Sequence, residues 1–118
     1  MSSTKVTAKK SPPLVGFCPR FHRAVELIGR RWTGAIIRIL LSGPRRFNEI
    51  GAAVPGLSDR LLCERLRELE DEGIVRREVD PGPPLRVDYA LTQRGTELDA
   101  TIRSLASWAE RWFAPDRT

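Results

Sequence analysis

The sequence LSDRLLCERLRELEDEG, at residues 57–73, decides the fold of this chain. Its apolar side chains recur at the spacing of one helix face: Leu61, Leu62, Leu66 and Leu69. Ser58 stands where an N-cap is expected, and Gly73 stands where a helix ends. The pattern predicts one amphipathic helix of about four turns.

Basic side chains gather in the first half of this predicted helix. Arg60 and Arg67 project from the face opposite the leucines, whereas Arg65 lies at the edge of the apolar stripe, from which its guanidinium can reach outward. Acidic residues crowd the end of the helix, so the charge order runs against the helix macrodipole. The N-terminal half can therefore face phosphates, although a solvated face with an i,i+4 pair between Arg60 and Glu64 gives the same pattern.

Three further helices are expected before it. Pro19 is placed to begin the first, because proline is preferred at the first helical position, and Gly29 to end it. Residues 32–41 are the most apolar stretch and predict a buried helix. Residues 47–54 predict a short helix that a Pro-Gly turn joins to the long one. A short helix, a turn with glycine and a longer helix with exposed arginines follow the helix-turn-helix order.

A β-hairpin is expected directly after the long helix. Residues 74–79 and 85–91 alternate apolar and polar side chains, and a Pro- and Gly-rich turn joins them. This is the order of a winged helix, with Arg86 near the tip of the wing. The predicted fold class is thus α+β, mainly α: a winged helix-turn-helix domain with a two-stranded β-hairpin wing.

A last helix is expected over residues 93–113, capped by Thr92. Its apolar side chains recur at four-three spacing: Leu98, Ile102, Leu105, Trp108, Ala109 and Trp112. A small monomer can hardly cover two tryptophans on a terminal helix, so we expect these residues at a homodimer contact. Packing against the chain's own core is the alternative.

The totals indicate one soluble domain. The chain has 118 residues and a net charge of +5. Residues 1–13 are basic and without acids and predict a disordered arm. Residues 14–118 are expected to form the domain, whose charge is concentrated in a basic zone between Arg30 and Arg67. The sequence shows neither a signal peptide nor an apolar run near 18 residues, so we expect a cytoplasmic protein without membrane contact.

Two cysteines, Cys18 and Cys63, match neither a disulfide framework nor a zinc spacing, and the chain has a single histidine, His22. We therefore expect no metal and no cofactor. The sequence also lacks a Gly-rich phosphate loop and a nucleophile motif, so an enzyme is the least favoured class.

The chain resembles the HxlR family of bacterial winged-helix transcriptional regulators over about residues 17–113. The motifs that carry the resemblance follow one another in order: Cys18-Pro19, Ile28-Gly29, Trp32-Thr33, GPRRF at residues 43–47, PGLS at residues 55–58, RLREL at residues 65–69, DEG at residues 71–73, and VDYALT at residues 87–92 with Gly95. The resemblance implies a homodimer through the first and last helices, which places Phe21 at the contact. It also implies that two recognition helices occupy successive major grooves of a palindromic or near-palindromic operator in double-stranded DNA.

The expected DNA-binding residues are Thr33, Arg45, Arg46, Ser58, Arg60, Arg65, Arg67 and Arg86. Of these, Arg60 and Arg67 are expected in the major groove and Arg86 in the neighbouring minor groove. We expect Ser58 to contact a phosphate or a base and the others to bind the backbone. A winged helix that serves only as a protein-interaction module would have the same core and is the alternative.

Cys18 is the expected redox-sensing residue. In members of the family that sense oxidants or electrophiles, the reactive cysteine lies close before the first helix, which matches Cys18. The helix start and the nearby Arg20, His22 and Arg23 would stabilise a thiolate. An oxidant or a small molecule is thus a possible effector, and a small apolar side chain packed at the helix start is the alternative.

Overall fold

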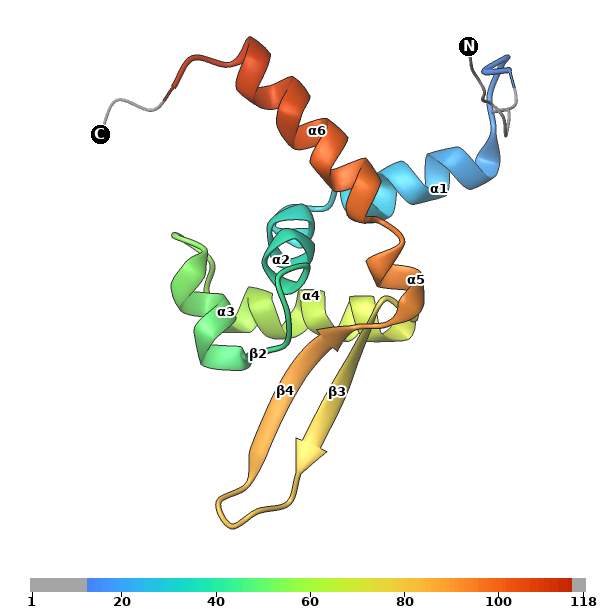
Figure 1. The fold of residues 1–118 in the computed structure, drawn as a ribbon. Helices are drawn as coiled ribbons and strands as arrows, with labels where there is room; N and C mark the ends of the chain where they lie inside the picture. The colour runs from blue at the N-terminus through green and yellow to red at the C-terminus, as the bar shows by residue number, and fades with distance from the viewer. Residues whose placement is uncertain (1–12, 116–118) are drawn as a thin grey trace, which may run out of the picture.

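The computed structural model describes residues 13–115, so all but the last residue of the expected N-terminal arm lies outside the described residues. The helices are α1 (Pro19–Ile28), α2 (Thr33–Leu40), α3 (Phe47–Ala53), α4 (Asp59–Asp71), α5 (Gln93–Thr96) and α6 (Asp99–Trp112). The strands are β2 (Arg45–Arg46), β3 (Val75–Asp80) and β4 (Arg86–Leu91). Figure 1 shows α2, α3 and α4 in the middle of the molecule, the β3–β4 hairpin on one side, and α1 and α6 on the other.

The apolar stripe of residues 57–73 forms the centre of the core. Leu62 and Leu69 have no exposed surface and Leu66 has 1%. They pack against buried side chains of α2 and α3, among them Ile36 and Ile50. Burying a leucine side chain contributes about 1.5–3 kcal/mol, so the three leucines are a large part of what holds α4 in place.

Both expected ends of α4 are confirmed. The Ser58 hydroxyl oxygen accepts a hydrogen bond from the Leu61 backbone N–H at 3.1 Å. Gly73 follows the C-cap with φ +74°, a conformation that costs a residue with a side chain about 1–2 kcal/mol. The chain can therefore turn directly from α4 into β3.

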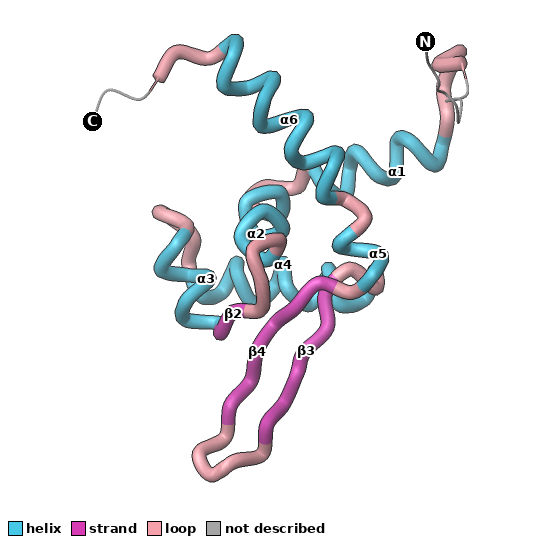
Figure 2. Tube along the Cα trace, viewed as in Figure 1, coloured by secondary structure: helices cyan, strands magenta, loops and turns pink. Residues whose placement is uncertain are grey.

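The sheet has three strands where the sequence predicted a two-stranded hairpin. β4 lies in the middle and pairs antiparallel with β3 and with the short β2. Arg45 of β2 lies opposite Tyr89, and Asp80 of β3 lies opposite Arg86 near the tip. Figure 2 shows the β3–β4 hairpin extending well beyond the helices, as expected of a wing. A strand of two residues has no periodicity, which is why the sequence did not indicate β2.

The predicted single last helix is wrong, because it divides into α5 and α6. The Leu98 N–H donates to the Gly95 carbonyl three residues back, which makes a tight turn at the break. Gly95 itself lies against Ile74, the residue directly before β3, since a Cβ there would be 2.4 Å from the Ile74 carbonyl oxygen. The tight packing of α5 against the hairpin thus sets a different direction for α6 (Figure 1).

Two helices leave the core with apolar side chains uncovered. α1 has no buried residue, and α6 has one, Ile102. Within residues 13–115, no helix has the length and apolar character needed to cross a bilayer.

Candidate nucleic-acid interface and thiol site

The exposed face of α4 is basic in its N-terminal half. Arg60, Cys63 and Arg67 are all exposed, three and four residues apart, and so lie along one stripe of the helix. Within residues 13–115, neither arginine forms an ion pair with an acidic side chain. The alternative pair between Arg60 and Glu64 does not form, because the Glu64 carboxylate lies 3.4 Å from Arg65 instead. The Arg67 Nη2 lies 3.9 Å from the Cys63 sulfur, a weak contact, so both guanidinium groups can still turn to phosphates or base edges.

Ser58 and β2 border the same surface. Ser58 is exposed, and its hydroxyl, which accepts the capping bond, keeps its proton to donate. The Arg46 side chain is exposed at the start of α3, where its backbone N–H donates to Glu49 at 2.9 Å. Arg45 is partly buried, and its guanidinium donates to the Pro44 carbonyl and to the Ser42 hydroxyl. Arg46 is therefore the more accessible of the two.

Two of the expected DNA contacts are wrong. Thr33 is only 1% exposed, because the first turn of α2 lies inside the core. Arg65 is 9% exposed, and its Nε donates to the Arg31 carbonyl oxygen at 2.9 Å. Its guanidinium therefore faces the junction of α1 and α2, where a DNA phosphate has no access.

Arg86 lies on the wing as expected, with about half of its side chain exposed. Its Nε is 3.2 Å from the Asp88 carboxylate on the same strand. An exposed pair of this kind contributes at most about 1 kcal/mol, so DNA can displace Asp88 at small cost.

Cys18 is the N-cap residue of α1 and is exposed. The backbone N–H groups of Phe21 and Arg20 lower the pKa of its thiol, and the Arg20 side chain contributes further in the same direction. The other two basic residues that were expected to stabilise the thiolate have acidic partners instead. The His22 ring lies 3.3 Å from Glu26, and Arg23 binds Glu72 of α4. The helix start, more than the neighbouring charges, thus favours the thiolate.

The expected contact residues of α1 and α6 largely line one apolar groove. The groove has a volume of about 740 Å³ and is lined by α1, α2 and α6, including Phe21, Leu98, Leu105 and Ala109. Phe21 is 66% exposed and Leu105 56%, and Trp108 and Trp112 of α6 are also exposed. Ile102 also lines the groove, but at 8% exposure it forms part of the floor that the groove shares with the core. Val25, which is 50% exposed, was missed as a groove residue although it continues the helical spacing from Phe21.

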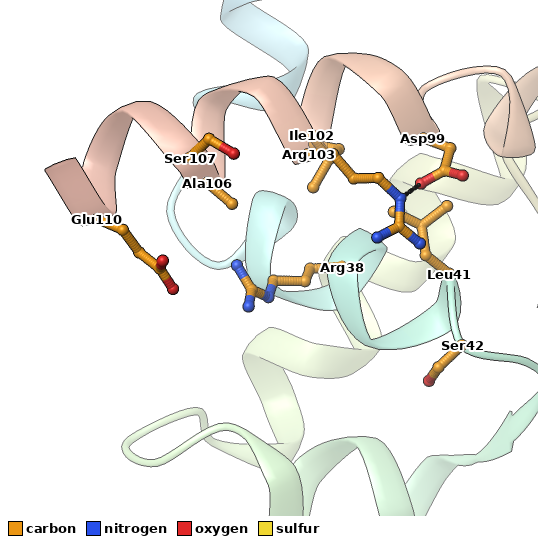
Figure 3. A pocket seen from close by; sticks show the side chains of 9 residues that line it. All are labelled: Arg38, Leu41, Ser42, Asp99, Ile102, Arg103, Ala106, Ser107 and Glu110. Carbon is orange, nitrogen blue, oxygen red and sulfur yellow. Dashed lines mark hydrogen bonds and ion pairs between the residues drawn. The ribbon is translucent and has the colours of Figure 1, made fainter.

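A second, polar pocket of about 420 Å³ lies between α2 and α6. In Figure 3, Arg38 and Glu110 point into it from opposite helices, and Arg103 is held by Asp99 at 2.6 Å. None of the three tryptophans, Trp32, Trp108 and Trp112, lines this pocket. Its four charged side chains sum to zero, so charge alone selects no class of ligand.

A helix-turn-helix made by α3 and α4, a basic face on α4 and a β-hairpin wing define a winged helix-turn-helix protein. The chain belongs to the HxlR-like helix-turn-helix family, whose model matches residues 27–117. It is accordingly a DNA-binding transcriptional regulator.

Its relatives include two regulators from Bacillus subtilis. The HTH-type transcriptional regulator YvaP is 47% identical over 98 residues, which cover 83% of this chain and 91% of YvaP. YodB is 44% identical over 101 residues, which cover 86% of this chain and 90% of YodB. The structure of reduced YodB superposes with a TM-score of 0.75 over 86% of this chain and all of that one. The oxidized form of the redox regulator HypR, 35% identical, gives 0.76 over 85% of this chain and all of that one.

Proposed function

We propose that this regulator acts as a homodimer on a palindromic or near-palindromic operator in the cytoplasm. The observation that carries the proposal is that Arg60 and Arg67 are both exposed on one face of α4, and that neither forms an ion pair with an acidic side chain among residues 13–115. A dimer places two such helices about one turn of DNA apart, which suits an inverted repeat. The apolar groove of α1 and α6 supports the dimer, because large exposed apolar patches mark protein interfaces.

Arg60 and Arg67 read bases in this proposal, while Arg46, Arg45 and Ser58 bind the DNA backbone. Arg86 enters the minor groove from the wing, where the negative potential favours a guanidinium. A bidentate contact to guanine is worth about 1–3 kcal/mol of discrimination. Loss of a phosphate contact instead weakens all sequences alike and lowers the salt dependence.

Binding-site selection from random duplexes with the purified protein would yield the operator, and fluorescence anisotropy over a range of salt would then measure affinity. We expect Arg60→Ala to lose about 1–3 kcal/mol on the operator and little on random DNA. Arg46→Ala is the matched control and should weaken both alike while lowering the salt slope. Binding that ignores sequence and salt would contradict the proposal and favour the protein-interaction module.

We further propose that oxidants or electrophiles regulate the protein through Cys18. The lowered pKa and the exposure of this thiol support the proposal. The YodB structures that resemble this chain include a diamide-treated and a quinone-bound form, with TM-scores of 0.70 and 0.71. In this chain, a thiolate adding to a quinone would place a bulky group at the start of α1, beside the apolar groove, and alter the dimer there.

Cys63 is also an exposed free thiol, and because it lies between Arg60 and Arg67 an adduct on it would obstruct DNA by itself. The test is therefore made in the Cys63→Ser background, in which a quinone should release the operator from Cys63→Ser but not from the double variant Cys18→Ser/Cys63→Ser. Mass spectrometry would locate the adduct. Release from the double variant to the same extent as from Cys63→Ser would exclude Cys18 as the sensor.

A further inference from the structure

Arg65 is a buried cation in the middle of α4 that the DNA-binding surface does not use. Only 9% of the residue is exposed. Its Nε donates to the Arg31 carbonyl oxygen at 2.9 Å, and its Nη1 lies 3.3 Å from Glu68 and 3.4 Å from Glu64. The guanidinium thus joins α4 to the backbone between α1 and α2.

Two outer ion pairs extend the same connection. Arg30, which follows α1, lies 3.2 Å from the Glu68 carboxylate that also binds Arg65. Arg23 of α1 donates to both carboxylate oxygens of Glu72 at 2.9 and 3.2 Å. These outer arginines are half exposed or more, so each pair alone contributes little. The buried Arg65 is the centre of the connection, because its bonds are least screened by water.

We infer that Arg65 is a positioning residue that sets the rotation of the recognition helix α4 about its own axis. The inference rests on the proposed function, in which Arg60 and Arg67 of α4 read bases. Leu62, Leu66 and Leu69 hold α4 against the core through apolar contacts, which are non-directional. The planar guanidinium adds a bond of fixed direction from α4 to a segment outside it, at the Arg31 carbonyl oxygen. Glu68 lies on α4 itself, so its bond to Arg65 holds the guanidinium in place, and its pair with Arg30 adds a second connection to the end of α1.

The direction of the DNA-reading side chains follows from this setting. Arg60 and Arg67 lie five residues before and two after Arg65 on one rigid helix, so a rotation of α4 turns both of them together. Contacts to base edges require close geometry, whereas contacts to phosphates tolerate small displacements. Loss of Arg65 therefore reduces discrimination between operator and random DNA more than it reduces binding to DNA in general.

The test compares Arg65→Met with the wild type on the selected operator and on a random duplex of equal length. Methionine keeps the length and apolar packing of the stem and removes the bonds. We expect the ratio of the two affinities to fall about tenfold. A partly unfolded variant would lose both affinities by the same factor and leave the ratio unchanged, so the ratio separates positioning from mere stability.

Arg76→Met is the matched control, because Arg76 also donates to a backbone carbonyl, that of Leu91 at 2.9 Å, and binds a carboxylate, that of Glu78. It should keep the wild-type ratio. If Arg65→Met does not fold by circular dichroism, Arg65→Lys decides, since lysine keeps the charge without the planar fork and should lower the ratio less steeply.

The outcomes distinguish the two proposals. A wild-type ratio near one would refute the proposed function. A high wild-type ratio that Arg65→Met, or Arg65→Lys where methionine does not fold, leaves within twofold would overturn the inference and leave the function intact.

Discussion

The start of α1 gives Cys18 an environment that its charged neighbours do not. The sequence placed three basic residues close to this thiol, yet His22 and Arg23 bind Glu26 and Glu72. The pKa of the thiol is therefore lowered mainly by the free backbone N–H groups in the first turn of α1, with a further contribution from the Arg20 side chain. Arg65 shows the opposite case, in which a residue expected at the surface is buried by the tertiary fold. The type of a side chain predicts which interactions it can make. Which neighbouring residue it binds, and whether it is buried, depends on tertiary packing that the sequence does not show.

The lowered pKa of Cys18 predicts a fast reaction at neutral pH. The folded protein holds more thiolate below the ordinary pKa of a cysteine thiol, so iodoacetamide should alkylate Cys18 faster at pH 7 than it alkylates the same residue in urea. The rate should rise with pH and level off at a lower pH in the folded state. The measurement uses Cys63→Ser, in which only Cys18 reacts. Equal midpoints in the folded and unfolded states would contradict the role of the helix start.

At the scale of elements, local sequence signals predicted where α1, α3 and α4 lie but missed β2 and the division of the last helix into α5 and α6. The bounds of α1 and the caps of α4 follow from Pro19, Gly29, Ser58 and Gly73, each of which has a local backbone reason to be there. The break between α5 and α6 arises from the approach of Gly95 to Ile74, just before β3, a contact between segments about twenty residues apart along the chain. No local pattern carries that information.

Two glycines near α4 predict stability changes of opposite sign. Gly73 has φ +74°, so Gly73→Ala should lower the free energy of unfolding by about 1–2 kcal/mol. Gly51 lies inside α3, where an added Cβ would meet Leu62 Cδ2 at an ordinary 3.6 Å. Gly51→Ala should therefore raise the free energy of unfolding by about 0.5–1 kcal/mol. Urea denaturation at one fixed protein concentration measures both, and equal effects would contradict the assignment.

At the scale of the whole molecule, the apolar groove takes no residue from α4, the helix that carries the DNA-reading surface. Figure 1 shows α2 between α4 and α6. The sequence indicated both surfaces, because exposed arginines on α4 and apolar spacing on α1 and α6 are patterns in one dimension. It could not tell how deeply each residue of the stripe is buried: Ile102 is 8% exposed and Leu105 is 56% exposed, although both continue the same stripe and both line the groove. Which part of an apolar stripe stays open for a partner thus depends on the path of the whole chain.

Leu105 tests the proposed dimer at this scale. It is 56% exposed in the groove, and Leu105→Glu would bury a charge in each subunit of a dimer, which is costly without a partner. We expect sedimentation to show the wild type at twice the chain mass of 13.3 kDa and the variant at the chain mass. Operator affinity should fall by more than tenfold, because one recognition helix then binds alone.

Val79→Glu is the control for this prediction, because Val79 is also 56% exposed but lies on β3, away from the groove. It makes the same change from an apolar to an acidic side chain and should leave the mass unchanged. Circular dichroism would verify that both variants keep their helices. A Leu105→Glu protein that still sediments as a dimer would move the subunit contact elsewhere on the molecule. The two recognition helices would then need another arrangement to reach an inverted repeat.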